Sequence, residues 1–284
     1  MTEATPGTID AHVHVWQPPT PRFPLAGGYT AEDMEPRTFT PEILLGHARS
    51  CGVERIVLIQ MSYYGFDNSY MLHVMQEHPG VFSGVAVIDD TAADPAAEMR
   101  RLKAQGVRGF RLVTHNRDPG AWFDSDGIRA MWTCGAGENL AMGMLINPDV
   151  LPILGKMCAR FPDTPVVIDH LARIGIGAPI RDEDVAALCR LAEQPNVKVK
   201  VSAFYLMGAA TPPYHDLAPF IRRVFEAFGP GRLMWATDCP YQVAPGHTYR
   251  NSIELVKNGL DFLSGEDRDQ LLRRTAEATY FNPI

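Results

Sequence analysis

Short apolar segments alternate with helix-like segments along almost the whole chain, and this alternation limits the fold more than any other feature. Strands are predicted at 8–16, 55–61, 81–88, 107–113, 140–146, 165–169, 197–203 and 232–237. Helices are predicted at 40–50, 67–78, 94–105, 125–137, 149–160, 182–193, 216–228, 248–263 and 266–279. Such alternation is typical of parallel strands joined by right-handed crossovers. Eight strands of this kind in 284 residues favour an α/β fold, a closed (β/α)8 TIM barrel, over an open doubly wound sheet.

The predicted barrel spans residues 1–284 as a single domain, because no composition break or internal repeat marks a boundary. Neither of the glycine-rich motifs that cradle nucleotide phosphates is present. Residues 1–7 are expected to form a tail. Residues 17–40 are rich in proline and glycine, and a connection of this length is uncommon in a compact domain. We expect this segment to form a lid loop over the functional site.

Composition limits the partners of the protein. The formal net charge of −7 argues against nucleic acid or an anionic membrane surface. No apolar segment approaches the roughly 20 residues needed to cross a bilayer, and the first residues do not read as a secretion signal. We expect a cytoplasmic protein that acts on a small molecule, with a monomer and a homo-oligomer as open alternatives. The five cysteines contain no Cys-x-x-Cys pair and are expected to be reduced thiols.

The first predicted strand carries a pair of histidines. In Thr8–Trp16, Asp10, His12 and His14 alternate with apolar residues, so the three side chains share one face of the strand. A single histidine on a strand is usually a core residue with a satisfied hydrogen bond. Two on one face are close enough to bind one ion or one substrate group.

Closure of the barrel brings distant residues to this pair. The last strand of a closed barrel lies beside the first, so Asp238 should stand next to His12 and His14. His170 ends the sixth predicted strand. Active sites of this fold lie at the carboxyl ends of the strands. The sequence therefore predicts a site built from four potential ligands or proton carriers.

The motifs around these residues resemble those of the amidohydrolase superfamily, in particular its branch of TIM-barrel lactonases. They are Asp10-Ala-His12-Val-His14, Gly109-Phe-Arg111-Leu, Val167-Ile-Asp-His170-Leu-Ala-Arg173, Asn196-Val-Lys-Val-Lys200-Val-Ser202 and Trp235-Ala-Thr-Asp238-Cys-Pro240. The resemblance extends over nearly the whole chain. It implies a hydrolase, and it leaves metal content open, because this branch includes both zinc-containing and metal-free enzymes.

One departure from the superfamily pattern bears on the metal. Where many metal-dependent members carry a histidine or lysine at the end of strand five, this chain has Ile146-Asn147-Pro148, and asparagine is a poor zinc ligand. A binuclear centre is therefore not expected. The alternatives are one divalent metal, with zinc as the expected ion, held by His12, His14, His170 and Asp238, or a metal-free site whose histidines polarise a carbonyl group.

The resemblance implies that Asp238 acts as the general base that activates water for lactone opening. Arginine suits an acidic substrate because its planar fork matches a carboxylate. The predicted substrate-binding residues are Arg111, Arg173, Tyr64, Ser62 and His115. For the two arginines the alternative is a structural ion pair, and tyrosines at strand ends commonly pack under loops.

The interior lysine of the seventh predicted strand should be structural. Lys200 is expected to point into the barrel, where a buried lysine must be paired, and Asp10 is the expected partner.

These observations predict a hydrolase that opens a small carboxylated or sugar-derived lactone. The alternatives are a metal-dependent decarboxylase of the same superfamily, which the missing strand-five histidine disfavours, and a barrel that binds a small acid without turnover.

Overall fold

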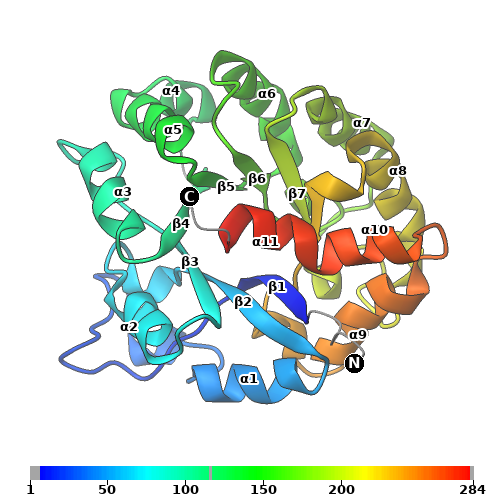
Figure 1. Ribbon diagram of the computed structural model, residues 1–284, viewed down its shortest axis with the longest axis horizontal. Coiled ribbons are helices and arrows are strands. Elements are labelled where there is room, and N and C mark those ends of the chain that lie inside the picture. The colour runs from blue at the N-terminus through cyan, green and yellow to red at the C-terminus, as the bar shows by residue number, and fades with distance from the viewer. Residues whose placement is uncertain (1–6, 115–116, 282–284) are drawn as a thin grey trace, which may run out of the picture.

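The computed structural model describes residues 7–114 and 117–281. Eight parallel strands follow one another in sequence order around the sheet (Figure 1). They are β1 (Thr8–Val13), β2 (Val53–Ile59), β3 (Phe82–Ala86), β4 (Val107–Val113), β5 (Ala141–Leu145), β6 (Val166–Ile168), β7 (Val197–Val201) and β8 (Leu233–Trp235). Every neighbouring pair from β1–β2 to β7–β8 is parallel. The predicted TIM barrel is therefore confirmed.

Backbone hydrogen bonds close the seam between the first and last strands. The amide of His14 donates to the carbonyl of Cys239 at 2.8 Å, and the amide of Asp238 donates to the carbonyl of His12 at 2.9 Å. Val13 and Cys239 form a parallel bridge. These bonds lie just beyond the end of β8, so they bring the segment that carries Asp238 directly against the histidine pair.

Helices surround the strands, and the last of them crosses one end of the barrel (Figure 1). They are α1 (Pro41–Arg49), α2 (Ser69–Glu77), α3 (Pro95–Lys103), α4 (Pro119–Phe123), α5 (Asp126–Glu138), α6 (Leu151–Arg160), α7 (Asp182–Arg190), α8 (Ala218–Phe228), α9 (Tyr249–Glu254), α10 (Gly265–Asp269) and α11 (Thr275–Tyr280). Side-chain caps start several of them: Asp94 accepts from the amide of Ala97 at α3, and Ser125 accepts from the amide of Ile128 at α5. The short helix α4 was not predicted.

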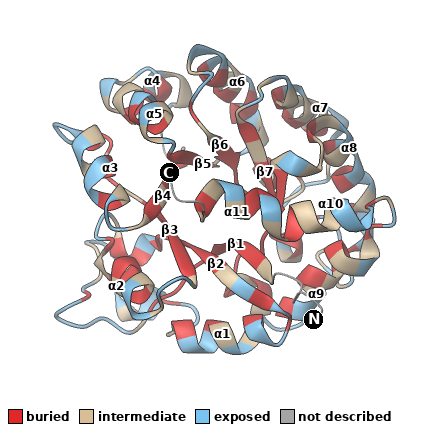
Figure 2. Cartoon of the chain, in the orientation of Figure 1, coloured by how far each residue is buried: buried red, intermediate tan, exposed pale blue. Residues whose placement is uncertain are grey.

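The barrel interior is filled by small and branched apolar side chains. Figure 2 shows the strands as almost uniformly buried, with exposed residues on the outer sides of the helices. The interior cluster consists of Ile9, Ala11, Val57, Ile59, Val85, Ala141, Val167, Met234 and Ala236, with Ala276 and Tyr280 from α11. Alternate residues of the same strands face the helices, which is the layered packing expected of this fold.

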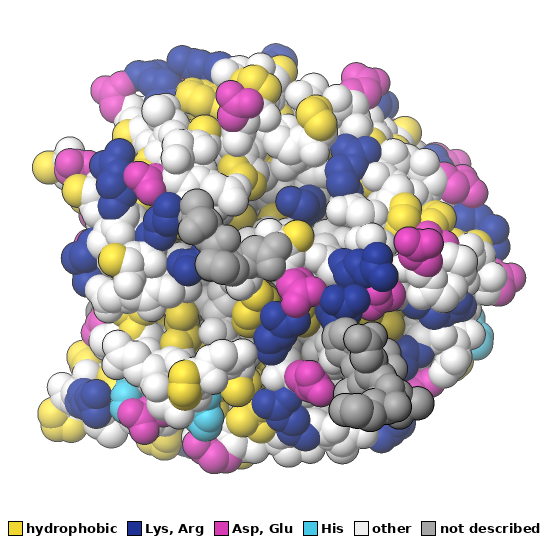
Figure 3. Space-filling view, viewed as in Figure 1, with side chains coloured by type: hydrophobic (Ala, Val, Ile, Leu, Met, Phe, Trp, Pro, Cys, Tyr) yellow, Lys and Arg dark blue, Asp and Glu magenta, His cyan; other side chains and the backbone are white. Residues whose placement is uncertain are grey.

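Helix α11 covers one end of the barrel. The Ser83 hydroxyl, near the start of β3, donates to the carbonyl of Tyr280 at 2.7 Å, and Thr275 donates to the carbonyl of Pro230, which precedes β8. This is the amino-terminal end of the strands, and Figure 3 shows acidic and basic side chains interspersed over that face. The open end is therefore the carboxyl-terminal end, where the predicted site lies.

Two further sequence predictions concern segments of the fold. Residues 17–40 are irregular apart from one short turn at Ala31–Asp33, as predicted, while residues 1–6 of the predicted tail lie outside the described residues.

All five cysteines are free thiols. Within 7–114 and 117–281, no helix has both the length and the apolar character that crossing a membrane requires.

Candidate active site

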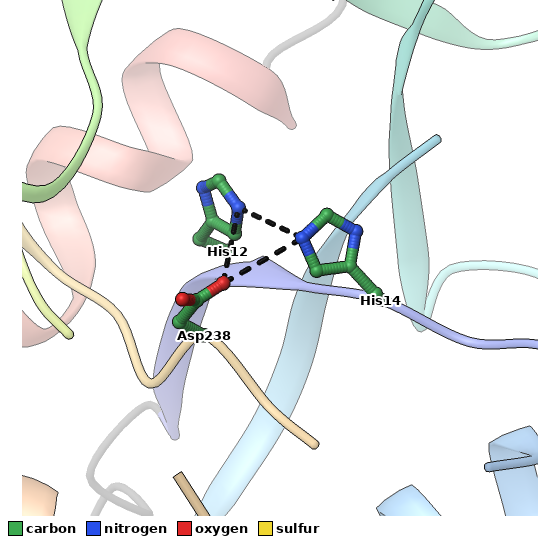
Figure 4. Close-up of side chains that lie close together, drawn as sticks. All are labelled: His12, His14 and Asp238. Atoms are coloured by element: carbon green, nitrogen blue, oxygen red, sulfur yellow. Dashed lines mark hydrogen bonds and ion pairs between the residues drawn. The ribbon is translucent and has the colours of Figure 1, made fainter. Parts of the chain in front are cut away.

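Three side-chain atoms converge where β1 meets the segment after β8 (Figure 4). The Nε2 atoms of His12 and His14 are 3.3 Å apart, and the Oδ1 atom of Asp238 lies 3.5 Å from each of them. All three residues are buried. The structure therefore brings together the histidine pair and the carboxylate that the sequence predicted to meet.

His170 joins this cluster from the end of β6. Its Nε2 atom lies 3.8 Å from Asp238 Oδ1, and its Nδ1 atom is 2.9 Å from the hydroxyl of Ser202. The ring of His170 lies beside that of His12, with centroids 4.4 Å apart. The fourth predicted site residue is thus also present at the cluster.

The backbone that carries these residues is strained. His170, Leu171, Ala172 and Arg173 all have positive φ angles, from 50° to 59°, and Asp238 has a φ of 68°. A left-handed conformation costs a residue with a Cβ atom roughly 1–2 kcal/mol, and such residues persist only where the surrounding structure holds them. The left-handed turn sends His170 and Arg173 from one short segment to the same cavity.

Hydrogen bonds of the outer ring nitrogens orient the histidines. The Nδ1 atom of His14 is 2.9 Å from the carbonyl oxygen of Ile59, so it carries the proton and Nε2 presents a lone pair to the cluster. His12 Nδ1 lies between Asp169 Oδ1 at 3.3 Å and Lys200 Nζ at 3.1 Å. If His12 donates to Asp169, its Nε2 also presents a lone pair, whereas donation by Lys200 leaves a proton on Nε2.

Beneath the histidines lies a buried group of charges. Asp169, which directly precedes His170, forms an ion pair with Lys200 at 3.0 Å and another with Arg111 at 3.3 Å. The prediction that Lys200 pairs with Asp10 is therefore wrong. Asp10 instead accepts hydrogen bonds from the amide and hydroxyl of Thr237 and from the hydroxyl of Tyr249.

The surroundings fix the charge states of these groups. Burial alone would raise the pKa of Asp238, but the neighbouring histidines, His170 foremost, outweigh it and hold that pKa below its usual value. Burial and the adjacent Lys200 push the pKa of His12 well below its usual value. At neutral pH the cluster consists of an ionised carboxylate and a neutral His12.

This donor set fits a divalent cation. Atoms bound to zinc at about 2.0–2.1 Å in a tetrahedral arrangement lie about 3.3 Å apart, which is close to the separations between His12, His14 and Asp238. The carboxylate contact to His12 Nδ1 is the orientation commonly found behind metal-binding histidines. The residues that could hold the cation are His12, His14 and Asp238, with His170 beside them.

A cavity of about 390 Å³ opens above the cluster. His14, His170 and Asp238 form part of its wall, and so do the predicted substrate-binding residues Arg111, Arg173 and Ser62. His12 is fully buried beneath it.

Two other predicted substrate-binding residues do not fit this picture. Tyr64 is absent from the cavity wall, because its hydroxyl is hydrogen-bonded to the backbone of Gln17. It holds the start of the 17–40 segment. His115 lies outside the described residues.

Sequence reasoning missed two residues of the site, Tyr205 and Asp169. The hydroxyl of Tyr205 donates to Asp238 Oδ2 at 2.7 Å, and the ring lines the cavity. Tyr205 follows β7 in an irregular segment without periodicity, so only its position just after a strand end could have indicated it. Asp169 was assigned to a predicted strand, although a carboxylate directly before a candidate ligand histidine is a usable signal.

A closed eight-stranded barrel with histidines, a carboxylate and a cavity at the carboxyl ends of its strands has the architecture of the TIM-barrel enzymes. Within that class, the sequence profile of the amidohydrolase family matches residues 9–281. The chain belongs to the amidohydrolase family, as the sequence motifs predicted.

Individual relatives extend the comparison. An L-fucono-1,5-lactonase from Burkholderia ambifaria is 29% identical over 248 residues, which cover 84% of this chain and 82% of the relative. A 2-pyrone-4,6-dicarboxylate hydrolase from Comamonas testosteroni is 30% identical over 257 residues, covering 85% of this chain and 79% of the relative. The crystal structure of a probable 2-pyrone-4,6-dicarboxylic acid hydrolase from Acinetobacter baumannii, with citric acid bound, matches with a TM-score of 0.80 at 26% identity, covering 96% of this chain and 99% of that one.

Proposed function

We propose that this protein hydrolyses a small carboxylated or sugar-derived lactone by attack of water on the ring carbonyl. The observation that carries the proposal is the convergence of His12, His14 and Asp238 in the wall and floor of a cavity that also contains two arginines. The relatives that open sugar-acid and pyrone lactones support the same reaction class.

We assign the general base to Asp238. Its carboxylate is ionised, lines the cavity and is fixed at both oxygens, by the histidines at Oδ1 and by Tyr205 at Oδ2. In the proposed reaction it takes a proton from the attacking water as the new C–O bond forms. It returns that proton to the ring oxygen when the lactone C–O bond breaks. The product is a hydroxy acid that ionises at neutral pH and releases one proton per turnover.

The remaining residues bind and polarise the substrate in this proposal. His12, His14, His170 and Asp238 would hold one divalent cation, and their imidazole and carboxylate donors suit zinc. When bound, such a cation supplies Lewis acidity at the lactone carbonyl. Arg173 and Arg111 attract the acidic group of the substrate, and Ser62 offers a hydroxyl. Without a metal, the histidines would have to donate hydrogen bonds to the developing oxyanion.

Substitution of Asp238 tests the mechanism. Asp238→Asn removes the base while keeping the size of the side chain, so we expect proton release from a hydrolysed lactone to fall at least about a hundredfold. The melting temperature of the chelator-treated protein should stay unchanged. A pH-stat assay across a lactone panel measures this. The matched control is Asp261→Asn, which changes an exposed carboxylate of a surface ion pair and should leave the rate unaltered.

Two results would reject the proposal. Retained lactone hydrolysis in Asp238→Asn would remove the assigned base. Release of CO₂ from carboxylated compounds by an enzyme that opens no lactone would favour the decarboxylase alternative.

A further inference from the structure

The cavity wall outside the catalytic cluster is mainly apolar. Five aliphatic side chains contribute to it: Met61, Leu145, Ile176, Ala203 and Leu206. The rings of Tyr205 and Tyr241 complete this surface. Apart from the histidines, Asp238 and the two tyrosine hydroxyls, the polar side chains of the described wall are Ser62, Arg111 and Arg173.

Hydrogen-bond acceptors are scarce in this wall. Asp238 Oδ1 faces the histidines, and Oδ2 accepts from Tyr205. The remaining side-chain acceptors in the described wall are ring nitrogens of His14 and His170, which face Asp238, and the hydroxyls of Ser62, Tyr205 and Tyr241. The Tyr205 hydroxyl is bound to Asp238, and the Tyr241 hydroxyl lies 3.9 Å from the sulfur of Met61. Neither an amide side chain nor a second carboxylate lines the part of the cavity that the structure describes.

A ligand with many hydroxyls would therefore lose hydrogen bonds on entering. Each hydroxyl that exchanges water for an apolar wall without a partner costs about 1–3 kcal/mol. An apolar pocket rejects a ligand that carries one added hydroxyl by roughly a hundredfold. The wall favours a ring that carries few hydroxyls.

The arginines require an acidic group. Among the described residues, Arg173 forms no ion pair, and its buried Nε atom has no hydrogen-bond partner. Arg111 shares the charge of Asp169, which also pairs with Lys200. A buried cationic nitrogen without a partner is costly, so a carboxylate on the ligand that contacts Arg173 would satisfy it.

The rings of Tyr205 and Tyr241 in the cavity wall favour a ligand with a flat ring. Their planes are inclined by only 22°, with centroids 6.5 Å apart, so they present similarly oriented faces. The hydrogen bond to Asp238 fixes the Tyr205 ring beside the base. A planar unsaturated ring gains contact area and stacking on such faces, whereas a puckered saturated ring does not.

We propose that the substrate is a planar, unsaturated lactone that carries a carboxylate and few or no hydroxyls, rather than a polyhydroxylated sugar-acid lactone. This inference rests on the proposed lactone hydrolysis and selects between its two substrate classes. The apolar wall, the unpaired Arg173 and the similarly oriented rings of Tyr205 and Tyr241 each favour the planar, unsaturated class of lactone.

A matched pair of substrates tests the proposal. Muconolactone is unsaturated and carries one carboxylate, whereas galactaro-γ-lactone has the same ring size and charge but several hydroxyls. We expect kcat/KM for muconolactone to exceed that for galactaro-γ-lactone by at least about a hundredfold. Equal values, or a preference for the hydroxylated lactone, would overturn the inference while leaving lactone hydrolysis intact.

A substitution in the wall tests the cause of the preference. Leu206 lines the cavity and is 44% exposed, so Leu206→Asn adds a donor and an acceptor with little risk to folding. We expect the muconolactone preference to fall by about three- to tenfold, the range of one added hydrogen bond. The control is Ile43→Asn on α1, at a comparably exposed residue outside the cavity, which should keep the preference. An unchanged preference in Leu206→Asn would contradict the role given to the wall.

A binding measurement separates failure of this inference from failure of the proposed function. Isophthalate is a flat dicarboxylate without hydroxyl groups. Glucarate is a dicarboxylate of equal charge that carries many hydroxyl groups. We expect isophthalate to raise the melting temperature at concentrations where glucarate does not. If neither lactone is hydrolysed, the proposed function fails, and this comparison then decides the ligand preference of the cavity by itself. Stronger binding of glucarate would refute the preference.

Discussion

Asp238 is restrained at both carboxylate oxygens, and Tyr205 supplies one of the two restraints. The Tyr205 hydroxyl donates to Oδ2 at 2.7 Å, which leaves Oδ1 turned toward the histidines. Burial and the negative charge of Asp238 raise the pKa of Tyr205, so the hydroxyl keeps its proton and remains a donor. Tyr205 is therefore a positioning residue for the proposed base.

Removal of that hydroxyl should slow turnover more than it weakens binding. In Tyr205→Phe the ring still lines the cavity, so we expect kcat to fall about tenfold and KM to change less than about threefold. Loss of a donor to the carboxylate also raises its pKa, and the acid limb of the kcat profile should move to higher pH. Tyr214→Phe is the control, because that hydroxyl contacts His247 and Gln242 instead of Asp238. An unchanged kcat and pH profile in Tyr205→Phe would exclude the positioning role.

The site residues that the sequence predicted are those fixed by regular elements. His12 and His14 follow from alternation along β1, and Asp238 follows from barrel closure, both of which are general properties of strands. Tyr205 escaped because an irregular segment has no period. The predicted pairing of Lys200 with Asp10 was wrong because strand order does not fix how far along the barrel axis a side chain lies when the strands are staggered. In addition, β1 has a register shift between Asp10 and Val13.

At the scale of elements, Asp10 joins β1 to the end of β8 and to α9. Its carboxylate accepts from the amide and hydroxyl of Thr237, the hydroxyl of Tyr249 and the amide of His12. Burial raises the pKa of Asp10 to about 6, even though these hydrogen bonds pull it down. The ionised Asp10 carboxylate thus bridges the first and last strands, and its burial lowers the folding stability by an amount that depends on pH.

Asp10→Asn should remove this pH dependence. The folded pKa of about 6 exceeds the ordinary value of 3.8 for an aspartic acid, so the group favours folding when protonated and this contribution is lost as pH rises through 6. Relative to the variant, the wild type should lose up to about 3 kcal/mol of unfolding free energy between pH 4 and 7. Urea unfolding at both pH values measures the difference. A wild-type–variant difference that stays constant with pH would contradict a raised pKa at this position.

At the scale of the whole molecule, the strand order and the closed barrel followed from periodicity, because eight alternating segments leave few other topologies. The ends of elements were less predictable. Helix α4 (Pro119–Phe123) has a local start signal, the Asp118 cap followed by Pro119, but it is too short to show a period. The left-handed turn after β6 contains no glycine between His170 and Arg173, so no local pattern indicated it. No described residue of 17–40 lines the cavity, so the lid function of that segment stays a prediction.

The candidate cation site links the first strand of the barrel to the segment after the last strand. His12 and His14 belong to β1 and the region just after it, whereas Asp238 follows β8. A cation held by all three would join the seam of the barrel and would bind only the folded chain. Binding of this kind stabilises the folded state by mass action, so metal should raise the melting temperature of the whole molecule.

Titration of the chelator-treated protein with Zn²⁺, followed by calorimetry and thermal unfolding, tests the central claim that the buried cluster is a cation site. We expect one ion per chain and a rise in melting temperature of about 5 °C or more at a hundredfold excess over Kd. His14→Ala should abolish both effects, while His73→Ala, on the surface of α2, should keep them. Absence of saturable binding and of any thermal shift, in a protein that still opens lactones after chelation, would contradict the account.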